Sequence, residues 1–485
     1  MHPTSFAGPY GIGDLGPEAY LFIDSLEAAG CKLWQVLPLG PTGYGDSPYQ
    51  CFSAFAGNPY LISPQLLLED GLLTIEDLSD MPDWEANRVD FGKIFLWKPV
   101  LLKRSFGHFS ELENSSPIKT SFNAFCRENK AWLDEYSLFM TIKGLNEGSA
   151  WTEWAETYRF RDASTLSRIQ AEQQETILEI KYSQFLFFKQ WTEIKHYANQ
   201  KGVQIIGDIP IFVAMDSADT WGNPDLFHLD KNGFPTVVAG VPPDYFSATG
   251  QLWGNPLYKW EDHEKTGYSW WINRIRASLS IYDIVRIDHF RGFAGYWEIP
   301  FGEPTAINGQ WVKGPGSKLF DAILAALGDL PIIAEDLGEI TPDVFELRDM
   351  FLLPGMKILQ FGFSGPDNPF LPHLYPQNCV VYTGSHDNDT VLGWYKTAPE
   401  HEVKFFHEYY NSSSPDVSDV MVRSIWSSVA IFAIAPLQDL LGLDTEARMN
   451  FPGKVGGYWA WRTTPASFSD DLIQRLRTYN HLYLR

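Results

Sequence analysis

Three short segments of this chain share one pattern, in which a run of apolar residues that predicts a buried β-strand ends in a carboxylic acid. The segments are IYDIVRIDHFRG (281–292), PIIAEDLGE (331–339) and CVVYTGSHDND (379–389), and their strands end at Asp288, Glu335 and Asp387. Because a parallel sheet or barrel brings such strand ends to one face, we expect the three acids to lie together. Glycosidic-bond chemistry needs one ionised and one protonated carboxyl group, so three acids in one pocket are typical of it.

Helix-like and strand-like segments alternate along most of the chain. Residues 17–30 begin with Pro, end with Gly and carry apolar positions at helical spacing, and residues 31–40 follow as a strand. Further strands are expected at 203–213, 281–288, 331–335, 357–363, 379–384 and, with a less regular pattern, 438–444, and further helices at 269–279, 316–328, 341–350 and 419–433. This alternation predicts an α/β fold with a parallel sheet, closed as a TIM (β/α)8 barrel; a doubly wound sheet stays open as the alternative.

The alternation is interrupted once. From about residue 65 to 200, mixed-charge segments with helical periodicity dominate, and the last of them leads into the strand at 203–213. We therefore predict that residues 65–185 form a mostly helical insertion subdomain, and that residues 1–64 and 186–485 form the barrel.

Composition narrows the class of ligand. The 485 residues include 37 Lys and Arg against 60 Asp and Glu, and the formal net charge of −23 disfavours nucleic acid and anionic membranes as partners. A neutral sugar is unaffected by that charge. Aromatic residues make up 15% of the chain, with 18 Trp, and such flat side chains stack on sugar rings, although large cores use them too.

The cysteines and the chain start indicate a reducing, cytoplasmic compartment. Cys31, Cys51, Cys126 and Cys379 have no CxxC spacing, so neither a zinc site nor a disulfide framework is expected. The start MHPTSFAGPY has neither a basic nor an apolar signal region, and no apolar run reaches about 18 residues, so we expect no membrane span. A processed organelle protein would have the same pattern.

The VRID sequence places a cation next to the first acid. Side chains on a strand alternate between its two faces, so Arg286 and Asp288 point the same way. The guanidinium group should depress the pKa of Asp288 and keep it ionised, as a nucleophile must be. A purely structural ion pair at a strand end would have the same sequence.

The other two acids have different surroundings. Glu335 follows an apolar run with little compensating charge. Burial raises the pKa of a carboxyl group, as a general acid requires. The alternative interpretation is that Glu335 is an acid at the N-terminus of a helix, where it would complement the helix dipole. His386 and Asp387 follow Gly384–Ser385, where the backbone can approach a ligand closely. A nucleophilic triad would need a G-x-S-x-G elbow, which is absent, and a metal site would need further His or Cys, so binding of sugar hydroxyls is favoured over a metal.

Two glycine-containing segments have opposite interpretations. The loop at 240–260 holds Tyr245, Phe246 and Trp253 among Gly and Pro, a composition typical of lids, although a packed surface loop is possible. A lid that excludes water would favour a sugar acceptor over water.

Gly11, Gly13 and Gly16 form the pattern G-x-G-x-x-G, which is typical of dinucleotide sites. Only ten residues precede this pattern, and they include Pro3 and Pro9. The strand that a dinucleotide site requires is missing, and no cofactor is expected.

The chain as a whole resembles the amylomaltase (disproportionating enzyme) family of 4-α-glucanotransferases. The resemblance runs nearly from end to end, and the order of its motifs makes it specific. The motifs are HPTSFAGPYGIGDLG (2–16), YGDSPYQCFSAFAGNPYLI (44–62), GDIPIFVA (207–214), GQLWGNPLY (250–258), RIDHFRG (286–292), AEDLG (334–338), TGSHDND (383–389) and RMNFPG (448–453).

This resemblance implies a TIM barrel of the α-amylase type with helical insertions. It implies Asp288 as nucleophile, Glu335 as acid/base and Asp387 as stabiliser of the transition state. By the same resemblance, substrate contacts are expected from Arg286, His386, Asp208, Ser47, Tyr49 and Trp253, and from Asp244, Tyr245 and Phe246 in a covering loop. Family members usually have a short apolar strand before HPTS, and here Met1-His2 opens the sequence, so the first barrel strand is expected to be truncated or absent.

The expected reaction is retaining transfer of α-1,4-glucan segments between malto-oligosaccharides or starch, through a covalent glycosyl-enzyme. Retention predicts that the carboxyl groups of Asp288 and Glu335 lie about 5–5.5 Å apart. Expected partners are α-1,4-glucans of three or more units, with no nucleic acid, membrane or metal, in a monomer or weak homodimer. Hydrolysis by an amylase-like enzyme, a silent glucan-binding protein and a metal-dependent hydrolase are the competing interpretations.

Overall fold

Parallel strands that alternate with helices form the centre of the molecule. The computed structural model describes residues 1–243, 247–412, 416–454 and 456–485, and only the backbone of Tyr44. The central strands are β1 (Leu33–Gln35), β2 (Gln204–Pro210), β5 (Ile284–Asp288), β8 (Ile332–Ala334), β9 (Gly355–Ile358), β10 (Cys379–Tyr382) and β11 (Phe432–Ile434). They pair in the orders β1-β2-β5-β8 and β9-β10-β11, every pair parallel.

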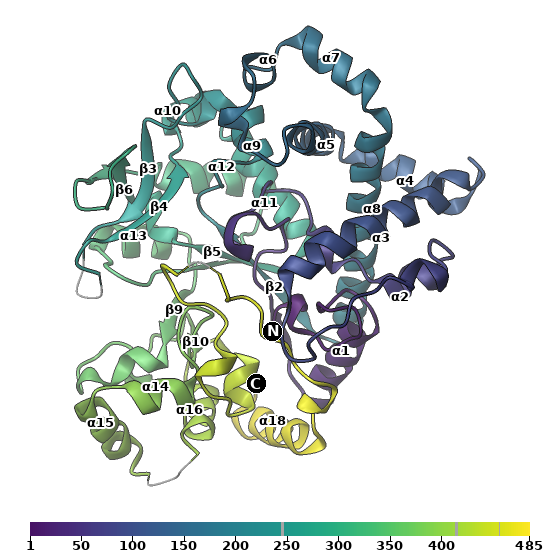
Figure 1. Cartoon of the computed structure of the whole chain (residues 1–485). Helices are drawn as coiled ribbons and strands as arrows, with labels where there is room; N and C mark the ends of the chain where they lie inside the picture. Colours follow the sequence, from purple (N-terminus) through teal and green to yellow (C-terminus); the bar gives the residue numbers. More distant parts are fainter. Residues whose placement is uncertain (244–246, 413–415, 455) are drawn as a thin grey trace.

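The two groups of strands belong to one barrel. The amide of Ala334 at the end of β8 donates to the carbonyl of Pro354 just before β9 at 2.9 Å, which joins them. The intervening helices lie outside the strands (Figure 1). They are α1 (Pro17–Ala29), α8 (Gln174–Gln200), α11 (Ser269–Ile281), α12 (Ser317–Leu327), α13 (Pro342–Met350), α14 (Val391–Thr397), α15 (Glu400–Tyr410), α16 (Val417–Trp426), α17 (Leu437–Leu440) and α18 (Asp470–Tyr483). The predicted α/β TIM-barrel fold is confirmed.

Two predicted strands differ from the structure. The range 357–363 overlaps β9 only at 357–358 and is otherwise part of a 3-10 helix, Leu359–Ser364, and the last predicted strand is wrong. The segment 438–444 is not a strand, because it contains most of α17. The last central strand is β11, and its residues 432–433 fall in the range predicted as the helix 419–433. The helix there, α16, ends at Trp426, and Ser427–Ser428 separate it from the apolar run that forms β11. A short apolar run looks alike in a buried helix and a buried strand, which explains the misassignment.

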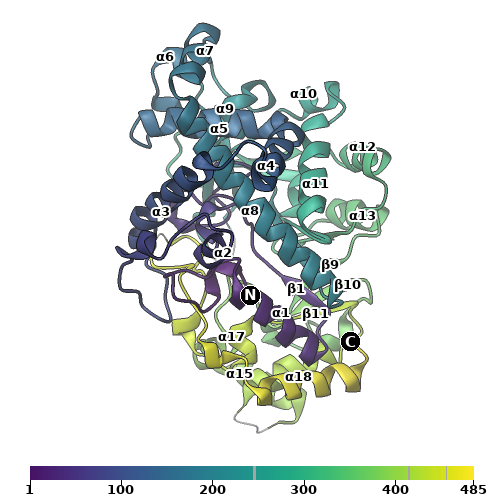
Figure 2. The same cartoon turned by 90° about the vertical axis from the view of Figure 1, so that its right-hand side faces the viewer.

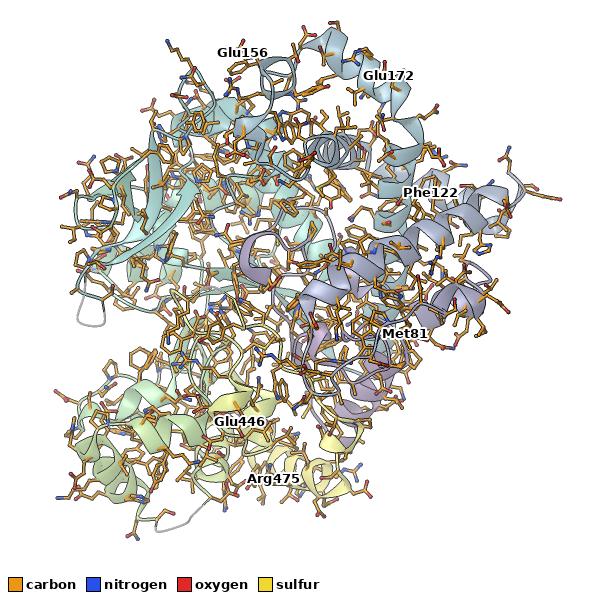
Figure 3. The ribbon with its side chains drawn as sticks, viewed as in Figure 1. Met81, Phe122, Glu156, Glu172, Glu446 and Arg475 are labelled. Carbon is orange, nitrogen blue, oxygen red and sulfur yellow. The ribbon has the colours of Figure 1, made fainter. Side chains whose placement is uncertain are left out.

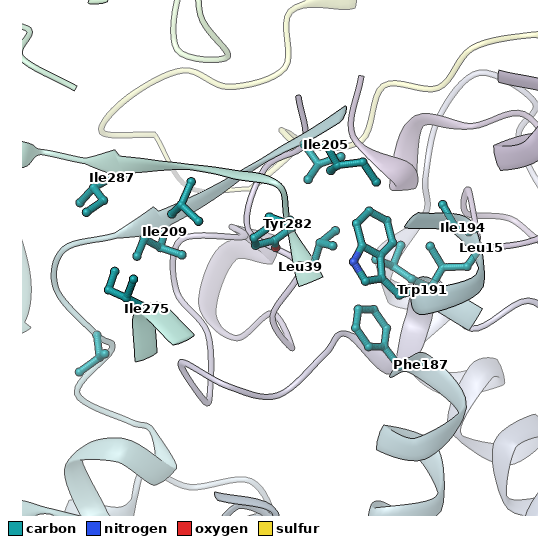
Figure 4. Close-up of a cluster of buried hydrophobic side chains, with 14 of the residues drawn as sticks. Leu15, Leu39, Phe187, Trp191, Ile194, Ile205, Ile209, Ile275, Tyr282 and Ile287 are labelled. Atoms are coloured by element: carbon teal, nitrogen blue, oxygen red, sulfur yellow. The ribbon is translucent and has the colours of Figure 1, made fainter. Parts of the chain in front are cut away.

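Local sequence explains the first helix and the central strand. Pro17 occupies the first helical position of α1, and Gly30 ends the helix with φ 74°, a left-handed conformation that glycine adopts without steric cost. Strand β2 is buried over most of its length, as a strand covered on both faces must be. Figure 4 shows Trp191 of α8 packed near Ile205 of β2, and the Trp191 indole N–H donates to the carbonyl of Ile281 at 2.9 Å.

The helical region between β1 and β2 extends away from the barrel. Its helices are α2 (Pro64–Glu69), α3 (Phe91–Glu111), α4 (Pro117–Glu128), α5 (Lys130–Leu145), α6 (Glu156–Arg159) and α7 (Ala163–Glu172), followed by the long α8. Glu156 and Glu172, labelled in Figure 3, mark the outermost helices α6 and α7. Trp97 and Phe106 of α3 belong to the same apolar core as Trp34 of β1, so the division at residues 65 and 185 stays a prediction.

A second, antiparallel sheet follows β2. It has the order β4-β3-β6-β7 and consists of β3 (Val237–Val241), β4 (Gln251–Pro256), β6 (Gly295–Pro300) and β7 (Gln310–Lys313). The short helix α9 (Ala218–Gly222) precedes this sheet in sequence, and α10 (Trp260–Lys265) lies between β4 and β6. Within the described ranges, none of the helices has the length and apolarity to cross a membrane.

Candidate active site

The carboxyl ends of neighbouring barrel strands bring the predicted acids together. In the register of β2 and β5, Asp208 lies opposite Arg286, and β5 ends at Asp288. Glu335 follows β8 directly: its amide donates to the carbonyl of Ile287 at 3.1 Å, and its carbonyl accepts from the amide of Phe290 at 3.0 Å. The end of β5 and the residue after β8 are therefore fixed side by side by backbone hydrogen bonds.

A buried guanidinium group joins two of the carboxylates. Arg286 Nη1 donates to both carboxylate oxygens of Asp208 at 2.7 and 2.6 Å, and its Nη2 donates to Asp288 Oδ1 at 2.9 Å. Arg286 and Asp208 are almost fully buried, whereas the Asp288 side chain keeps 31% of its exposure. The predicted orientation of Arg286 and Asp288 on one face is thus confirmed, and only the acid at the strand end is open to a ligand.

Tyr49 connects this network to the loop after β10. Its hydroxyl donates to Asp208 Oδ2 at 2.8 Å and lies 3.4 Å from His386 Nδ1, and the two rings stack with centroids 5.0 Å apart. The other nitrogen of His386, Nε2, is 3.5 Å from Asp387 Oδ1. The third acid therefore belongs to the same constellation, although it comes from a separate strand.

Two residues that the sequence did not single out hold Asp387 in place. Asn450 Nδ2 donates to Asp387 Oδ1 at 2.6 Å, and Arg448 Nη2 donates to the Asp387 carbonyl at 2.5 Å. Both belong to RMNFPG, which served as a motif of resemblance without assigned roles. Trp459, in the left-handed region with φ 63°, packs on His386 with centroids 5.6 Å apart. The available signal in the sequence was a polar residue directly before Phe-Pro-Gly, but the sequence did not indicate which residue it contacts.

Glu335 has the surroundings of an acid that stays protonated. Its carboxyl group accepts hydrogen bonds from the amides of His289 at 2.6 Å and Leu337 at 2.9 Å, and no Lys or Arg forms an ion pair with it among the described residues. Burial, and secondly the charge of Asp288, raise its pKa from 4.5 to about 8. The sequence-based expectation of a raised pKa agrees with this direction.

Asp288 departs from expectation in one respect. The sequence predicted that Arg286 would depress its pKa, yet burial is the larger effect and raises the pKa, with Arg286 opposing it. The charges of Asp208 and Asp387 add to the upward shift. Between the two neighbouring acids, Asp288 accepts directly from a guanidinium group, whereas Glu335 accepts from two backbone amides, so these contacts favour the proton on Glu335 over the proton on Asp288.

The remaining predicted residues lie at varied positions. Trp253 of β4 packs against His289, the residue after Asp288, with ring centroids 4.7 Å apart, so it borders the site. The Ser47 hydroxyl accepts from the amide of Tyr49 at 3.3 Å, so Ser47 is connected to the acids through Tyr49. Asp244, Tyr245 and Phe246 lie outside the described residues. In the described part of the chain, no three or more His, Cys, Asp or Glu side chains are grouped as metal ligands would be.

This arrangement combines a carboxyl group paired with a guanidinium group, a second carboxyl group with a raised pKa, and a third acid beside a histidine. The three carboxyl groups influence one another, because the charge of Asp387 acts on Asp288 and that of Asp288 acts on Glu335. One nucleophile and one proton donor within a single constellation are what a retaining glycosidic reaction needs.

The Asn450 contact gives a first prediction. Asn450→Ala should lower kcat of the glucan transfer that the resemblance implies by about 10–100-fold, the range typical of groups that orient an active-site side chain, with little change in KM or melting temperature. Steady-state kinetics on maltotriose check this. The matched control is Asn308→Ala, an exposed asparagine on another loop, which should be unaffected. Equal losses in stability and in activity would instead indicate a purely structural role.

Comparison with known proteins identifies similar chains over the full length. Residues 1–467 match a family described as 4-alpha-glucanotransferase. The chain is 51% identical to a 4-alpha-glucanotransferase of Thermus thermophilus over 486 residues, 98% of this chain and 96% of that protein. It is 45% identical to one of Clostridium butyricum over 490 residues, which covers all of both. The solved amylomaltase of Streptococcus agalactiae, in complex with acarbose, superposes with a TM-score of 0.97 at 38% identity, covering 100% of this chain and 98% of that one.

Proposed function

This chain belongs to the 4-alpha-glucanotransferase family, and on that basis we propose that Asp288, Glu335 and Asp387 carry out a retaining transfer between α-1,4-glucans. The activity of the family is that of a 4-α-glucanotransferase, and the sequence-based assignment to it is confirmed. The roles of the individual residues and the choice of glucan are the proposal.

In the first step, the Asp288 carboxylate attacks the anomeric carbon of the donor glucan while Glu335 gives its proton to the departing 4-oxygen. The bond from the anomeric carbon to that oxygen breaks, and a covalent ester to Asp288 forms. In the second step, ionised Glu335 takes the proton of an incoming 4-hydroxyl group, whose oxygen displaces Asp288. Each step inverts the anomeric carbon, so the two together retain its configuration.

Asp387 and its neighbours complete the proposed site. Positive charge develops on the sugar ring in both steps, and Asp387, oriented by Asn450, offers hydroxyl-binding oxygens beside it. Arg286 keeps Asp288 aligned through the ion pair with Asp208. Trp253 borders the end of β5 and suits stacking on an acceptor sugar.

One observation carries the residue assignment: adjacent strand ends hold two acids with different surroundings. Asp288 accepts from a guanidinium group at 2.9 Å, whereas buried Glu335 has a pKa of about 8. A structural ion pair would not require a second, uncompensated acid next to it. The proposed substrates are neutral α-1,4-glucans of three or more units, as donor and as acceptor, with the protein acting as a monomer or weak homodimer.

Incubation with maltotriose separates transfer from hydrolysis. We expect a ladder of longer oligosaccharides together with glucose, because an acceptor hydroxyl group competes with water for the glycosyl-enzyme. Thin-layer or anion-exchange chromatography measures the products. Maltose and glucose alone would mean hydrolysis, and an unchanged maltotriose pool with binding to amylose would mean a silent binding protein.

A parallel reaction with excess chelator tests for a metal. The rate should stay unchanged, and a loss of activity would favour a metal-dependent hydrolase.

A further inference from the structure

One side chain of β9 reaches the ion pairs of the active site from inside the barrel. Strand β9 pairs in parallel with β10, and Met356 lies opposite Val380 in their register. Figure 2 shows β9 next to β10, below α13. Met356 is 2% exposed and packs in one apolar cluster with Ile206 of β2 and Ile284 of β5. Because side chains alternate along β5, Arg286 lies on the same face as Ile284 and also points into the barrel.

The guanidinium group of Arg286 donates to sulfur as well as to oxygen. Its Nη1 donates to both oxygens of Asp208, and its Nη2 donates to Asp288. Its third nitrogen, Nε, donates to the sulfur of Met356 with an Nε–Sδ distance of 3.3 Å. Among the described residues, no oxygen accepts from Nε. Since Arg286 is almost fully buried and a buried donor without an acceptor is costly, the sulfur satisfies a group that would otherwise be unpaired.

A thioether suits this position because it accepts a hydrogen bond without carrying a charge. The guanidinium group of Arg286 already pairs with two carboxylates, Asp208 and Asp288. A third carboxylate in place of Met356 would compete with Asp288 for this cation. A hydrocarbon side chain would leave Nε without an acceptor. Because the guanidinium group is planar and rigid, the direction of its Nε–H bond also sets the directions of Nη1 and Nη2.

The backbone of Met356 is held by the residue that follows the second acid. Its amide donates to Asp336 Oδ1 at 2.7 Å, and Arg348 Nη1 donates to Asp336 Oδ2 at 2.5 Å. Asp336 is buried and directly follows Glu335. Gly355 leaves room for this contact, because a Cβ atom there would lie 2.5 Å from Asp336 Oδ2. Met356 is therefore anchored through its backbone, independently of the group that its sulfur contacts.

We propose that Met356 is a positioning residue for the reaction: its sulfur orients the guanidinium group of Arg286, which in turn holds the nucleophile Asp288. This inference rests on the proposed function, because it takes Asp288 as the nucleophile. It requires an uncharged hydrogen-bond acceptor at position 356, and the size and apolarity of the side chain alone do not meet that requirement. The anchor at Asp336 joins this arrangement to the strand end that precedes Glu335.

The test compares two replacements of the same residue. Met356→Leu removes the acceptor and keeps an apolar side chain of similar size, whereas Met356→Gln keeps an uncharged acceptor. With maltotriose, Met356→Leu should lower kcat by about 10–100-fold, the range typical of groups that orient an active-site side chain, with little change in KM. Met356→Gln should recover most of that loss. Met421→Leu, at a fully buried methionine of α16, is the matched control and should leave kcat unchanged.

The pH profile separates positioning from packing. The charged and titratable groups that face Asp288 are Arg286, Asp208, Glu335, His386, Asp387 and the hydroxyl group of Tyr49. In the described part of the chain, only Arg286 among them has a hydrogen bond with Met356. A guanidinium group that turns away favours the neutral form of Asp288. The acid limb of kcat/KM should therefore move to higher pH in Met356→Leu, and it should stay in place in Met421→Leu.

A crystal structure of Met356→Leu tests the geometry without any turnover. The distance from Arg286 Nη2 to Asp288 Oδ1, 2.9 Å in the unmodified protein, should exceed the hydrogen-bond limit of about 3.2 Å. An unchanged distance, or unchanged kcat and acid limb, would overturn the proposal. Equal losses of kcat in Met356→Leu and Met356→Gln would also overturn it, because they would reduce the residue to packing. No transfer by the unmodified protein would refute the proposed function instead, and the distance would still decide whether the sulfur orients Arg286.

Discussion

Asp288→Asn should lower the rate of glucan transfer by at least about 10⁴-fold, because the amide cannot form the ester that links donor to protein. The fold should survive the change: the side chain is isosteric and partly exposed, and Arg286 keeps its two bonds to Asp208. The loss of activity is measured by disproportionation of maltotriose, and retention of the fold by thermal unfolding of the same preparation. Asp329→Asn, an exposed acid ahead of β8, is the matched control and should retain full activity.

Azide gives this prediction a stereochemical readout. In Asp288→Ala, azide occupies the space of the lost carboxylate and attacks an activated α-glucosyl fluoride from the nucleophile's face, so the product should be the β-glucosyl azide. Normal turnover by either Asp288 variant would refute its assignment as nucleophile. An α-azide would instead place a surviving nucleophile elsewhere in the site, with Asp387 the first residue to test.

The sequence predicted the catalytic end of the barrel because strand periodicity constrains it closely. Alternation along β5 puts Arg286 and Asp288 on one face, and an apolar run that stops at Glu335 places that acid at the mouth of the barrel. Both inferences depend only on neighbours in sequence. The resemblance to the amylomaltase family added Asp208 and Tyr49, whose contacts with this cluster span long separations in the chain.

What escaped prediction depends on burial and on contacts between distant segments. The upward shift of the Asp288 pKa arises because several elements bury this side chain. Burial outweighs the opposite effect of Arg286, which is the only one of the two that the sequence pattern indicates. Asn450 is 63 residues from Asp387, and no periodicity links them. Strand β11 was mistaken for the end of a helix because its pairing with β10, and not its composition, makes it a strand.

Glu335→Gln should reduce kcat/KM for maltotriose by about 10²–10⁴-fold, the usual contribution of a general acid. In the unmodified protein, kcat/KM should fall above pH 8, as Glu335 loses the proton that the leaving oxygen needs. The variant should lose this alkaline limb. With α-glucosyl fluoride as donor, whose leaving group needs no proton, formation of the glycosyl-enzyme should proceed at nearly the normal rate. Glu339→Gln, an exposed acid four residues away, should change none of these.

The same group should make stability depend on pH, with a definite sign. Its folded-state pKa of about 8 lies above the ordinary value of 4.5, so between these values the folded chain holds a proton that the unfolded chain has released. The stabilising contribution is therefore complete below pH 4.5 and is lost as pH rises through 8. In denaturant titrations, the free energy of unfolding should decline less from pH 5 to 8 in Glu335→Gln than in the unmodified protein. Parallel declines in the two would mean that Glu335 is ionised throughout, and the proton donor of the first step would then have to be sought in another residue.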